Sequence, residues 1–180
     1  LPILVFEQLS QGCISTAAYI SIHNMCSWMI DRFGSDELRK EWLPKLTSME
    51  FIASYCLTEP GSGSDAASLK TRAVRHGDHY VIDGSKQFIS SASIAGVVIV
   101  FAVTDPAAGK RGISAFLVPT NSKGFKVSRI EEKLGQKASD TCALAFDQLE
   151  LPVENRLGDE GDGLKIALSS LEQGRIGIAA

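Results

Sequence analysis

The stretch Tyr55–Ser68, YCLTEPGSGSDAAS, decides which fold the chain can adopt. Its centre, Gly61–Ala66, reads G-x-G-x-x-A, the spacing of the phosphate-binding turn of dinucleotide-binding folds. Such a turn must lie between a strand and a helix. Phe51–Leu57 predicts the strand, but Ala67–Arg75 alternates with a period of two and predicts a second strand. The parallel α/β fold is therefore excluded, and so is a P-loop, because no Gly-Lys-Ser/Thr follows.

What remains is a glycine-rich loop that connects two strands of a β domain. Gly61 and Gly63 allow positive φ angles and a close approach of the backbone to a ligand. The serine hydroxyls and consecutive amides of such a loop can bind phosphate oxygens. A plain surface turn has the same composition. The residues alone leave both interpretations open.

Patterns with a period of two continue through the centre of the chain. Tyr80–Ile82 and Gln87–Ser90 predict a hairpin around an Asp83-Gly84 turn. Further strands are predicted over 69–75, 97–103, 112–119, 125–130 and 143–149. Short strands with no helices between them indicate an antiparallel barrel or sandwich.

Helical periodicity lies on both sides of this β region. Apolar residues recur at helical spacing up to Phe33, where Gly34 is predicted to end one helix and Ser35 to cap the next. The helical pattern returns from Gly161, after three acidic residues that favour a helix N-terminus. We therefore predict three domains, 1–50, 51–155 and 156–180, in an α+β chain that looks cut at both ends.

The composition limits the function classes. The net charge of −3, with scattered lysines and arginines, argues against a nucleic-acid surface. The longest apolar run, 14–30, includes His23 and several serines, which favours a buried helix over a membrane span. The cysteines lie far apart, so we expect free thiols in a reducing compartment: Cys13, Cys26, Cys56 and Cys142.

No metal site or hydrolase site is expected. The acidic residues 159–162 lack the ligand spacing of a calcium loop. No Ser-His-Asp arrangement can be read from the sequence. His23 is expected to be a satisfied residue in the core, whereas His76 and His79 are expected to be exposed beside a Gly77-Asp78 turn.

Four motifs, in order along the chain, resemble the acyl-CoA dehydrogenase family of flavoproteins. They are CLTEPGSGSDAAS at 56–68, GSKQFIS at 84–90, KLGQKASDT at 133–141 and LPVENRLGDEGDG at 151–163. The resemblance covers essentially the whole chain. Segments 18–26 and 53–56 are most similar to the branch of the family that acts on isobutyryl-CoA.

The resemblance implies an α+β protein with the end of an N-terminal helical domain, a central antiparallel β-barrel and the start of a C-terminal helical bundle. It implies FAD as cofactor, in contact with Tyr55, Cys56, Leu57, Thr58, Glu59, Pro60, Gly61, Ser62, Gly63, Ser64, Phe88, Ile89 and Ser90. The Thr58 hydroxyl would meet the pyrimidine side of the flavin, and the Ser90 hydroxyl would lie near N5. Phe88 and Ser90 stand where other members often have Trp and Thr. Without the resemblance, Phe88 reads equally well as an inward residue of a hairpin.

The family removes an α-proton from an acyl-CoA and passes the β-hydride to the flavin, which an electron-transferring flavoprotein reoxidises. The resemblance implies that substrate is bound by Ser64, Glu172, Gln173, Gly174 and Arg175. A buried ion pair between helices is an alternative role for Arg175. The catalytic base is expected to be a glutamate beyond Ala180, because Gly174 stands where a minority of members carry that base and cannot abstract a proton.

Other functions stay open at this level. An acyl-CoA oxidase or a flavin monooxygenase of the same superfamily would share these motifs, and so would a non-catalytic fragment that binds flavin or acyl-CoA. Isobutyryl, 2-methylbutyryl and butyryl thioesters all fit, since one methylene contributes only about 1–3 kcal/mol of discrimination. The resemblance implies a homotetramer in the bacterial cytoplasm or the mitochondrial matrix.

Overall fold

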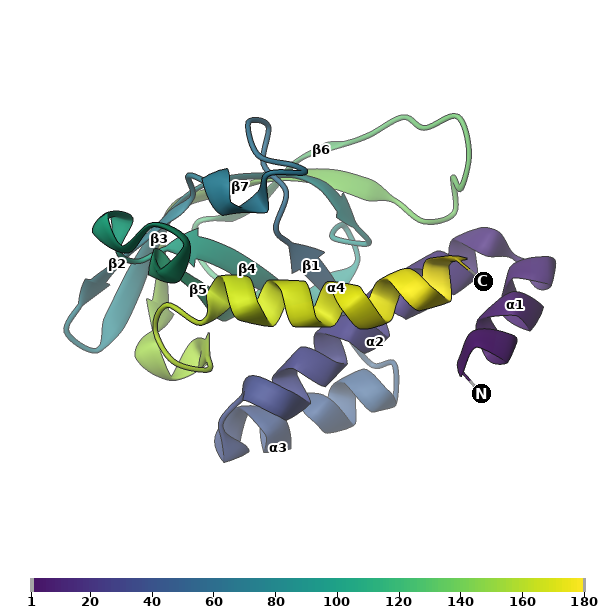
Figure 1. Cartoon of the computed structure of the whole chain (residues 1–180), viewed down its shortest axis with the longest axis horizontal. Helices are drawn as coiled ribbons and strands as arrows, with labels where there is room; N and C mark the ends of the chain where they lie inside the picture. The colour runs from purple at the N-terminus through teal and green to yellow at the C-terminus, as the bar shows by residue number, and fades with distance from the viewer. Residues whose placement is uncertain (1, 180) are drawn as a thin grey trace.

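The computed structural model describes residues 2–179, with residues 2, 173, 176 and 177 described by their backbone alone. It confirms the α+β class: helices precede a sheet, and one long helix follows it (Figure 1). The helices are α1 (Pro2–Gly12), α2 (Ile14–Phe33), α3 (Asp36–Thr47) and α4 (Gly163–Ala179). The strands are β1 (Ile52–Cys56), β2 (Arg72–His76), β3 (His79–Ser90), β4 (Ala95–Val103), β5 (Ile113–Pro119), β6 (Phe125–Ile130), β7 (Thr141–Pro152) and β8 (Arg156–Leu157). Short 3₁₀ helices are η1 (Ala66–Ser68), η2 (Pro106–Gly112) and η3 (Val153–Asn155).

The junction between α2 and α3 follows the predicted capping signals. The Gly34 amide donates to Ile30 O (2.9 Å), and a Cβ at Gly34 would lie 2.5 Å from that carbonyl oxygen. Ser35 caps α3, because its Oγ accepts from the Leu38 amide at 3.3 Å. These local bonds end one helix and begin the next within two residues.

The sheet has the order β6-β7-β3-β2-β4-β5-β8, with β1 paired to β4. Most neighbours are antiparallel, as expected, but β1 runs parallel to β4 over Ile52–Cys56. The prediction of an antiparallel sheet was wrong for β1, and also for β2, which pairs in parallel with β4 at Arg72 and Val103. The reason is that the chain leaves β1, forms the β2–β3 hairpin and only then returns beside β1, a connection that alternation within single strands cannot reveal.

Two apolar cores lie on the opposite faces of β4. Alternate residues Val97, Ile99 and Phe101 pack with α2, α3 and α4 in the helix-side core. Val98 and Val100 face the inner core, which the curved sheet encloses with side chains of β3, β5 and β7. Figure 1 shows α4, in yellow, lying along the helix-side face of the sheet. The helix-side core therefore fixes α4 against β4 and β5.

The predicted Asp83-Gly84 turn was wrong, since β3 runs unbroken through these residues. The hairpin turn lies instead at Gly77-Asp78, between β2 and β3. Asp83 accepts hydrogen bonds from the Gln148 amide (2.8 Å) and side chain (2.6 Å) on β7. Gly84, at φ +147°, lies where a Cβ would be 2.6 Å from Thr71 Oγ1, next to a β-bulge whose extra residue is on β7, between Phe146 and Leu149. Pairing on both edges thus keeps β3 extended through these turn-forming residues.

Candidate active site

The signature loop, defined here as Leu57–Ser68, leaves the end of β1 and folds back on itself. Glu59 and Ser62 exchange backbone hydrogen bonds of 2.8 and 3.1 Å, and Ser62 Oγ donates to Asp65 O at 2.7 Å. The predicted strand at 69–75 starts only at Arg72, because Ala66–Ser68 form the 3₁₀ turn η1. The loop is therefore a closed turn of its own rather than a plain link between strands.

The glycines of this turn are not required by the chain itself. Ideal Cβ atoms at Gly61 and Gly63 would meet no atom within 4 Å, and neither residue lies in the positive-φ region. Of the two properties that glycine allows here, positive φ and close approach of a ligand, the chain does not use the first. Both glycines and Ser64 are exposed, whereas Ser62 is buried. Two unhindered glycines on an exposed edge fit a ligand that approaches the backbone closely.

Of the two acidic residues of the loop, Glu59 points inward and Asp65 is exposed. Glu59 is buried, and its carboxylate accepts from the Lys70 amide (2.6 Å), the Thr71 amide (3.0 Å) and Lys86 Nζ (2.8 Å). Burial raises the pKa of Glu59, but the Lys86 charge and these hydrogen bonds outweigh it and hold the pKa below its ordinary value. Glu59 anchors the loop. Both carboxylate oxygens accept hydrogen bonds from the protein itself, so only the Glu59 backbone could contact a cofactor.

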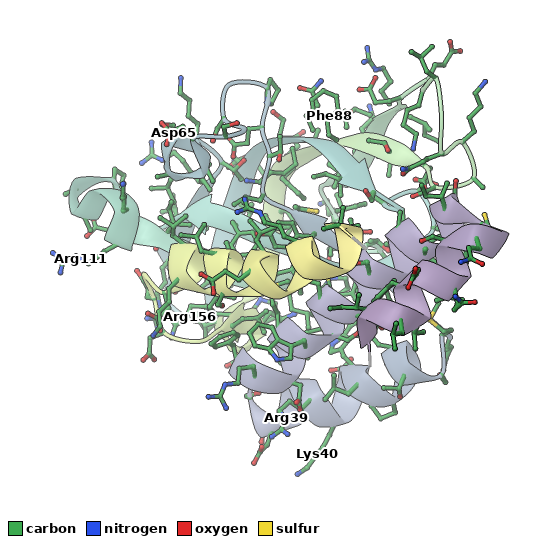
Figure 2. The ribbon with its side chains drawn as sticks, turned by 45° about the vertical axis from the view of Figure 1, so that its right-hand side comes forward. Arg39, Lys40, Asp65, Phe88, Arg111 and Arg156 are labelled. Carbon is green, nitrogen blue, oxygen red and sulfur yellow. The ribbon has the colours of Figure 1, made fainter. Side chains whose placement is uncertain are left out.

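A β-bulge turns Phe88 outward. The pairing of β3 with β7 shifts register between Lys86 and Ile89, so that two residues face one. Lys86 and Ile89 both point into the core, and Phe88, at φ +59°, is 60% exposed. The alternative of an inward Phe88 is thereby overturned. Figure 2 shows Phe88 and Asp65 on the side of the molecule opposite Arg39 and Lys40.

The structure brings the first two motifs together. The Gln87 amide donates to Thr58 O (2.9 Å), and Lys86 Nζ donates to Leu57 O (3.1 Å). Thr58 is half-buried. The side chains of Cys56 and Ile89 are buried in the inner core. The residues predicted to contact the cofactor therefore fall into two groups: some are exposed and can reach a ligand, and others are buried and support the exposed ones from inside.

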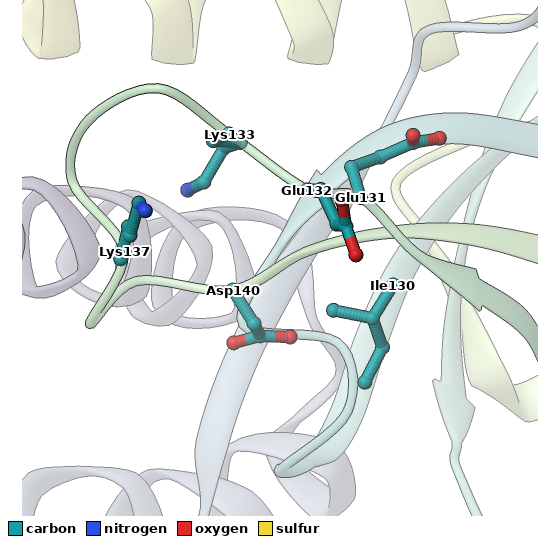
Figure 3. A pocket seen from close by; sticks show the side chains of 6 residues that line it. All are labelled: Ile130, Glu131, Glu132, Lys133, Lys137 and Asp140. Carbon is teal, nitrogen blue, oxygen red and sulfur yellow. The ribbon is translucent and has the colours of Figure 1, made fainter.

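Ser90 lies beside the third motif. It lines a pocket of about 380 Å³ together with Ala18, Lys133, Gly135, Gln136, Ser139 and Thr141. Asp140 ties this loop to the turn after β3, because it accepts from the Ser91 amide (3.0 Å) and the Ser93 amide (3.1 Å). A neighbouring pocket of about 490 Å³ is lined mostly by charged side chains of the same loop (Figure 3). The predicted neighbourhood of Ser90 is thus polar and open.

The predicted substrate residues are only partly gathered. Ser64 is exposed on the signature loop, while Glu172 and Arg175 are exposed on α4. The side chain of Gln173 lies outside the described residues. Across residues 2–179, no carboxylate pairs with Arg175, so its alternative role in a buried ion pair is not supported. No hydrogen bond joins Ser64 to the described part of α4.

Tyr55 connects β1 to α4 at this end of the molecule. Its hydroxyl donates to Ala167 O (3.3 Å), and its ring packs against Phe101 at 5.1 Å. Burial raises the pKa of Tyr55 above its ordinary value, and the nearby Arg175 charge opposes that shift. Tyr55 therefore supports the helix-side core.

The histidines have structural roles, as predicted. His23 is buried; its Nδ1 accepts from the Ala53 amide and its Nε2 donates to Leu46 O, both at 3.1 Å. His76 is exposed, and His79 is partly exposed beside Asp78. The four cysteines are free thiols. Among the described side chains, no group of three or more is placed to hold a metal ion.

Sequence reasoning did not assign a separate role to Lys86. It stood inside the second motif as one residue among several, and charged residues are rarely buried. The alternation of the strand could have indicated its burial. Lys86 lies four residues after buried Ile82, so its side chain points to the same, inward face of β3.

Comparisons with known proteins agree with the fold and the motifs. The acyl-CoA dehydrogenase N-terminal domain matches residues 2–50, and the acyl-CoA dehydrogenase middle domain matches residues 54–149. The chain is 51% identical over 177 residues to mitochondrial isobutyryl-CoA dehydrogenase of Bos taurus, covering 98% of the chain but 42% of that protein. The chain thus spans less than half the length of this relative.

Two solved structures extend the comparison. Butyryl-CoA dehydrogenase of Megasphaera elsdenii superposes with a TM-score of 0.95 at 37% identity, over 98% of this chain and 47% of that one. A glutaryl-CoA dehydrogenase of Mycobacterium smegmatis in complex with FADH2 gives 0.89 at 37% identity, over 97% and 44%. A family domain that matches more than half of the chain, in a fold this similar, is decisive: the chain belongs to the acyl-CoA dehydrogenase family.

Proposed function

We propose that the protein is an FAD-dependent acyl-CoA dehydrogenase that acts on a short, branched acyl-CoA of the isobutyryl type. The observation that carries the proposal is the exposed edge where the signature loop meets β3. There Gly61 and Gly63 present backbone that no neighbouring atom obstructs, and the β-bulge turns the Phe88 ring outward. The identity to isobutyryl-CoA dehydrogenase supports the choice of acyl group.

The residues of this edge suit a flavin. When bound, FAD supplies the acceptor for the hydride that leaves the β-carbon of the acyl group. The Thr58 hydroxyl and the amides of the signature loop would hold the polar edge of the ring, and Phe88 would cover an apolar part. Ser90 would hydrogen-bond on the side of the third motif, and Ser64 and Arg175 would orient the acyl-CoA.

The proton step requires a base that the described residues do not supply at this edge. Gly174 has no side chain, and Glu172 is exposed on another face of α4. We assign proton abstraction to a glutamate beyond Ala180.

We further propose a helical domain at 1–50, a flavin-binding β domain at 51–155 and a C-terminal helical domain from 156. We also propose that the protein forms a homotetramer and passes electrons to an electron-transferring flavoprotein. No helix in the described part of the chain is long and apolar enough to cross a membrane.

An anaerobic absorbance titration of the full-length protein tests the proposal. Isobutyryl-CoA should bleach the yellow flavin band at lower concentration than butyryl-CoA or 2-methylbutyryl-CoA, and free CoA should leave the band unchanged. A colourless protein, or a yellow one that no acyl-CoA bleaches, would contradict the proposed activity and favour a binding fragment. Rapid reoxidation of the bleached flavin by oxygen would instead indicate an oxidase or a monooxygenase.

A further inference from the structure

Lys86 is a fully buried lysine, and the hydrogen bonds that its ammonium group makes to described residues all end on the signature loop. Its side chain is 0% exposed, and its Nζ lies 2.8 Å from Glu59 Oε1 and 3.1 Å from Leu57 O. Both acceptors belong to the turn that carries Gly61 and Gly63. A lysine on β3 therefore joins the two motifs from inside the molecule.

Glu59 extends this link to the start of β2. Its two oxygens accept from the Lys70 and Thr71 amides as well as from Lys86. The cluster thus fixes the entry to β2, the middle of β3 and the exit of β1. Replacing a buried ion pair of this kind with apolar residues is often neutral for stability, so stability alone is weak grounds for its presence.

The β-bulge of β3 begins at the same lysine. Next to it, the Gln87 amide donates to Thr58 O at 2.9 Å, and Phe88 then turns out of the sheet at φ +59°. Lys86 points inward on the regular alternation of β3, and the register shift that follows it turns Phe88 outward. The position of Phe88 relative to Thr58 therefore depends on how firmly Lys86 holds the loop.

We propose that Lys86, paired with Glu59, is a positioning residue that sets the spacing between the two cofactor-facing segments, Leu57–Thr58 and Phe88–Ser90. The proposal rests on the proposed function, because it takes FAD as the ligand of that edge. Lys86 acts through the Leu57 carbonyl and the bulge. Its ammonium group is enclosed by the chain and does not reach the exposed edge.

Three variants of the full-length protein test this role. Lys86→Met removes the link but leaves the Glu59 charge buried, whereas the double variant Lys86→Met/Glu59→Gln removes both charges. Tyr80→Phe is the matched control, because Tyr80 is buried in the same strand, about 20 Å away at 3.3 Å per residue. Its hydroxyl donates to Glu160 (2.8 Å) and accepts from Arg156 (3.1 Å), so its loss weakens the sheet far from the edge.

Two measurements are made on all variants: the dissociation constant for FAD, and residue-resolved amide exchange of the FAD-free protein. We expect FAD binding to weaken about ten-fold or more, which corresponds to about 1.4 kcal/mol, in both Lys86 variants but not in Tyr80→Phe. The Gln87 amide should exchange its hydrogen faster in both Lys86 variants than in Tyr80→Phe, when each protein is measured at the same interval below its own melting temperature. The double variant should recover thermal stability relative to Lys86→Met without recovering FAD affinity.

The outcomes separate this proposal from the proposed function. If the wild-type protein binds FAD and the folded double variant binds it equally well, Lys86 is not a positioning residue. The same conclusion follows if Tyr80→Phe weakens binding as much as Lys86→Met does. If the wild-type protein itself does not bind FAD, the proposed function fails, and the positioning proposal fails with it.

Discussion

Replacing Gly61 or Gly63 with alanine should separate ligand binding from folding. The structure leaves open space where each Cβ would lie and shows no positive φ at either residue. A Gly→Ala change in a compatible conformation stabilises by about 0.4–1 kcal/mol, because the unfolded chain loses freedom. For a chain of this size, that corresponds to a rise of about 1–4 °C in melting temperature.

The same methyl group should obstruct a bound cofactor. Inserting a methyl group into a closely packed contact costs about 1–3 kcal/mol, which weakens binding by about 5- to 150-fold. Both quantities can be measured on one preparation, by thermal unfolding of the FAD-free protein and by quenching of flavin fluorescence on binding.

Gly12→Ala is the matched control, since a Cβ there also meets nothing within 4 Å and Gly12 lies at the end of α1, away from the signature loop. It should leave FAD affinity unchanged. Unaltered FAD affinity in both Gly61→Ala and Gly63→Ala would refute the close approach of the cofactor. A fall of several degrees in melting temperature would refute the claim that the chain does not need these glycines.

Two further predictions concern stability. Gly163→Ala should lower the free energy of unfolding by about 1–3 kcal/mol, because its Cβ would lie 2.6 Å from the Ser114 carbonyl carbon. Gly174→Ala should instead raise the free energy of unfolding by about 0.5–1 kcal/mol, since its Cβ would meet Met25 Sδ at 3.4 Å, an ordinary contact distance. Equal effects of the two substitutions in denaturant titrations would contradict the close packing of α4 on β5. Burial lowers the pKa of His23 below its ordinary value of 6.5, so the unfolded chain binds more protons and stability should fall as the pH drops below about 6.5. His23→Leu should be less stable at neutral pH and lack this slope, and an unchanged slope in unfolding measurements would assign the titration to another group.

Much of the fold follows from local patterns. The capping signals at Gly34 and Ser35 act within a few residues, so the helix boundaries there could be predicted directly. The dinucleotide-binding fold could be excluded because the alternation after Gly63 forbids the helix it requires. The site residues could be predicted because they lie in four sequence motifs, and the order of these motifs along the chain indicated the family.

The tertiary structure decided what depends on contacts between distant segments. Asp83-Gly84 has the composition of a turn, but pairing with β2 and β7 on either edge keeps β3 extended, and the extra residue of the register shift there lies on β7. The outward direction of Phe88 follows from a register shift, which moves side chains to the other face and leaves no mark in the sequence of one strand. The burial of Lys86 depends likewise on Glu59, which lies 27 residues earlier in the chain. Local patterns indicated most of the strands and helices. Which of their side chains face a ligand was settled by pairing between strands, because pairing sets the register of each strand.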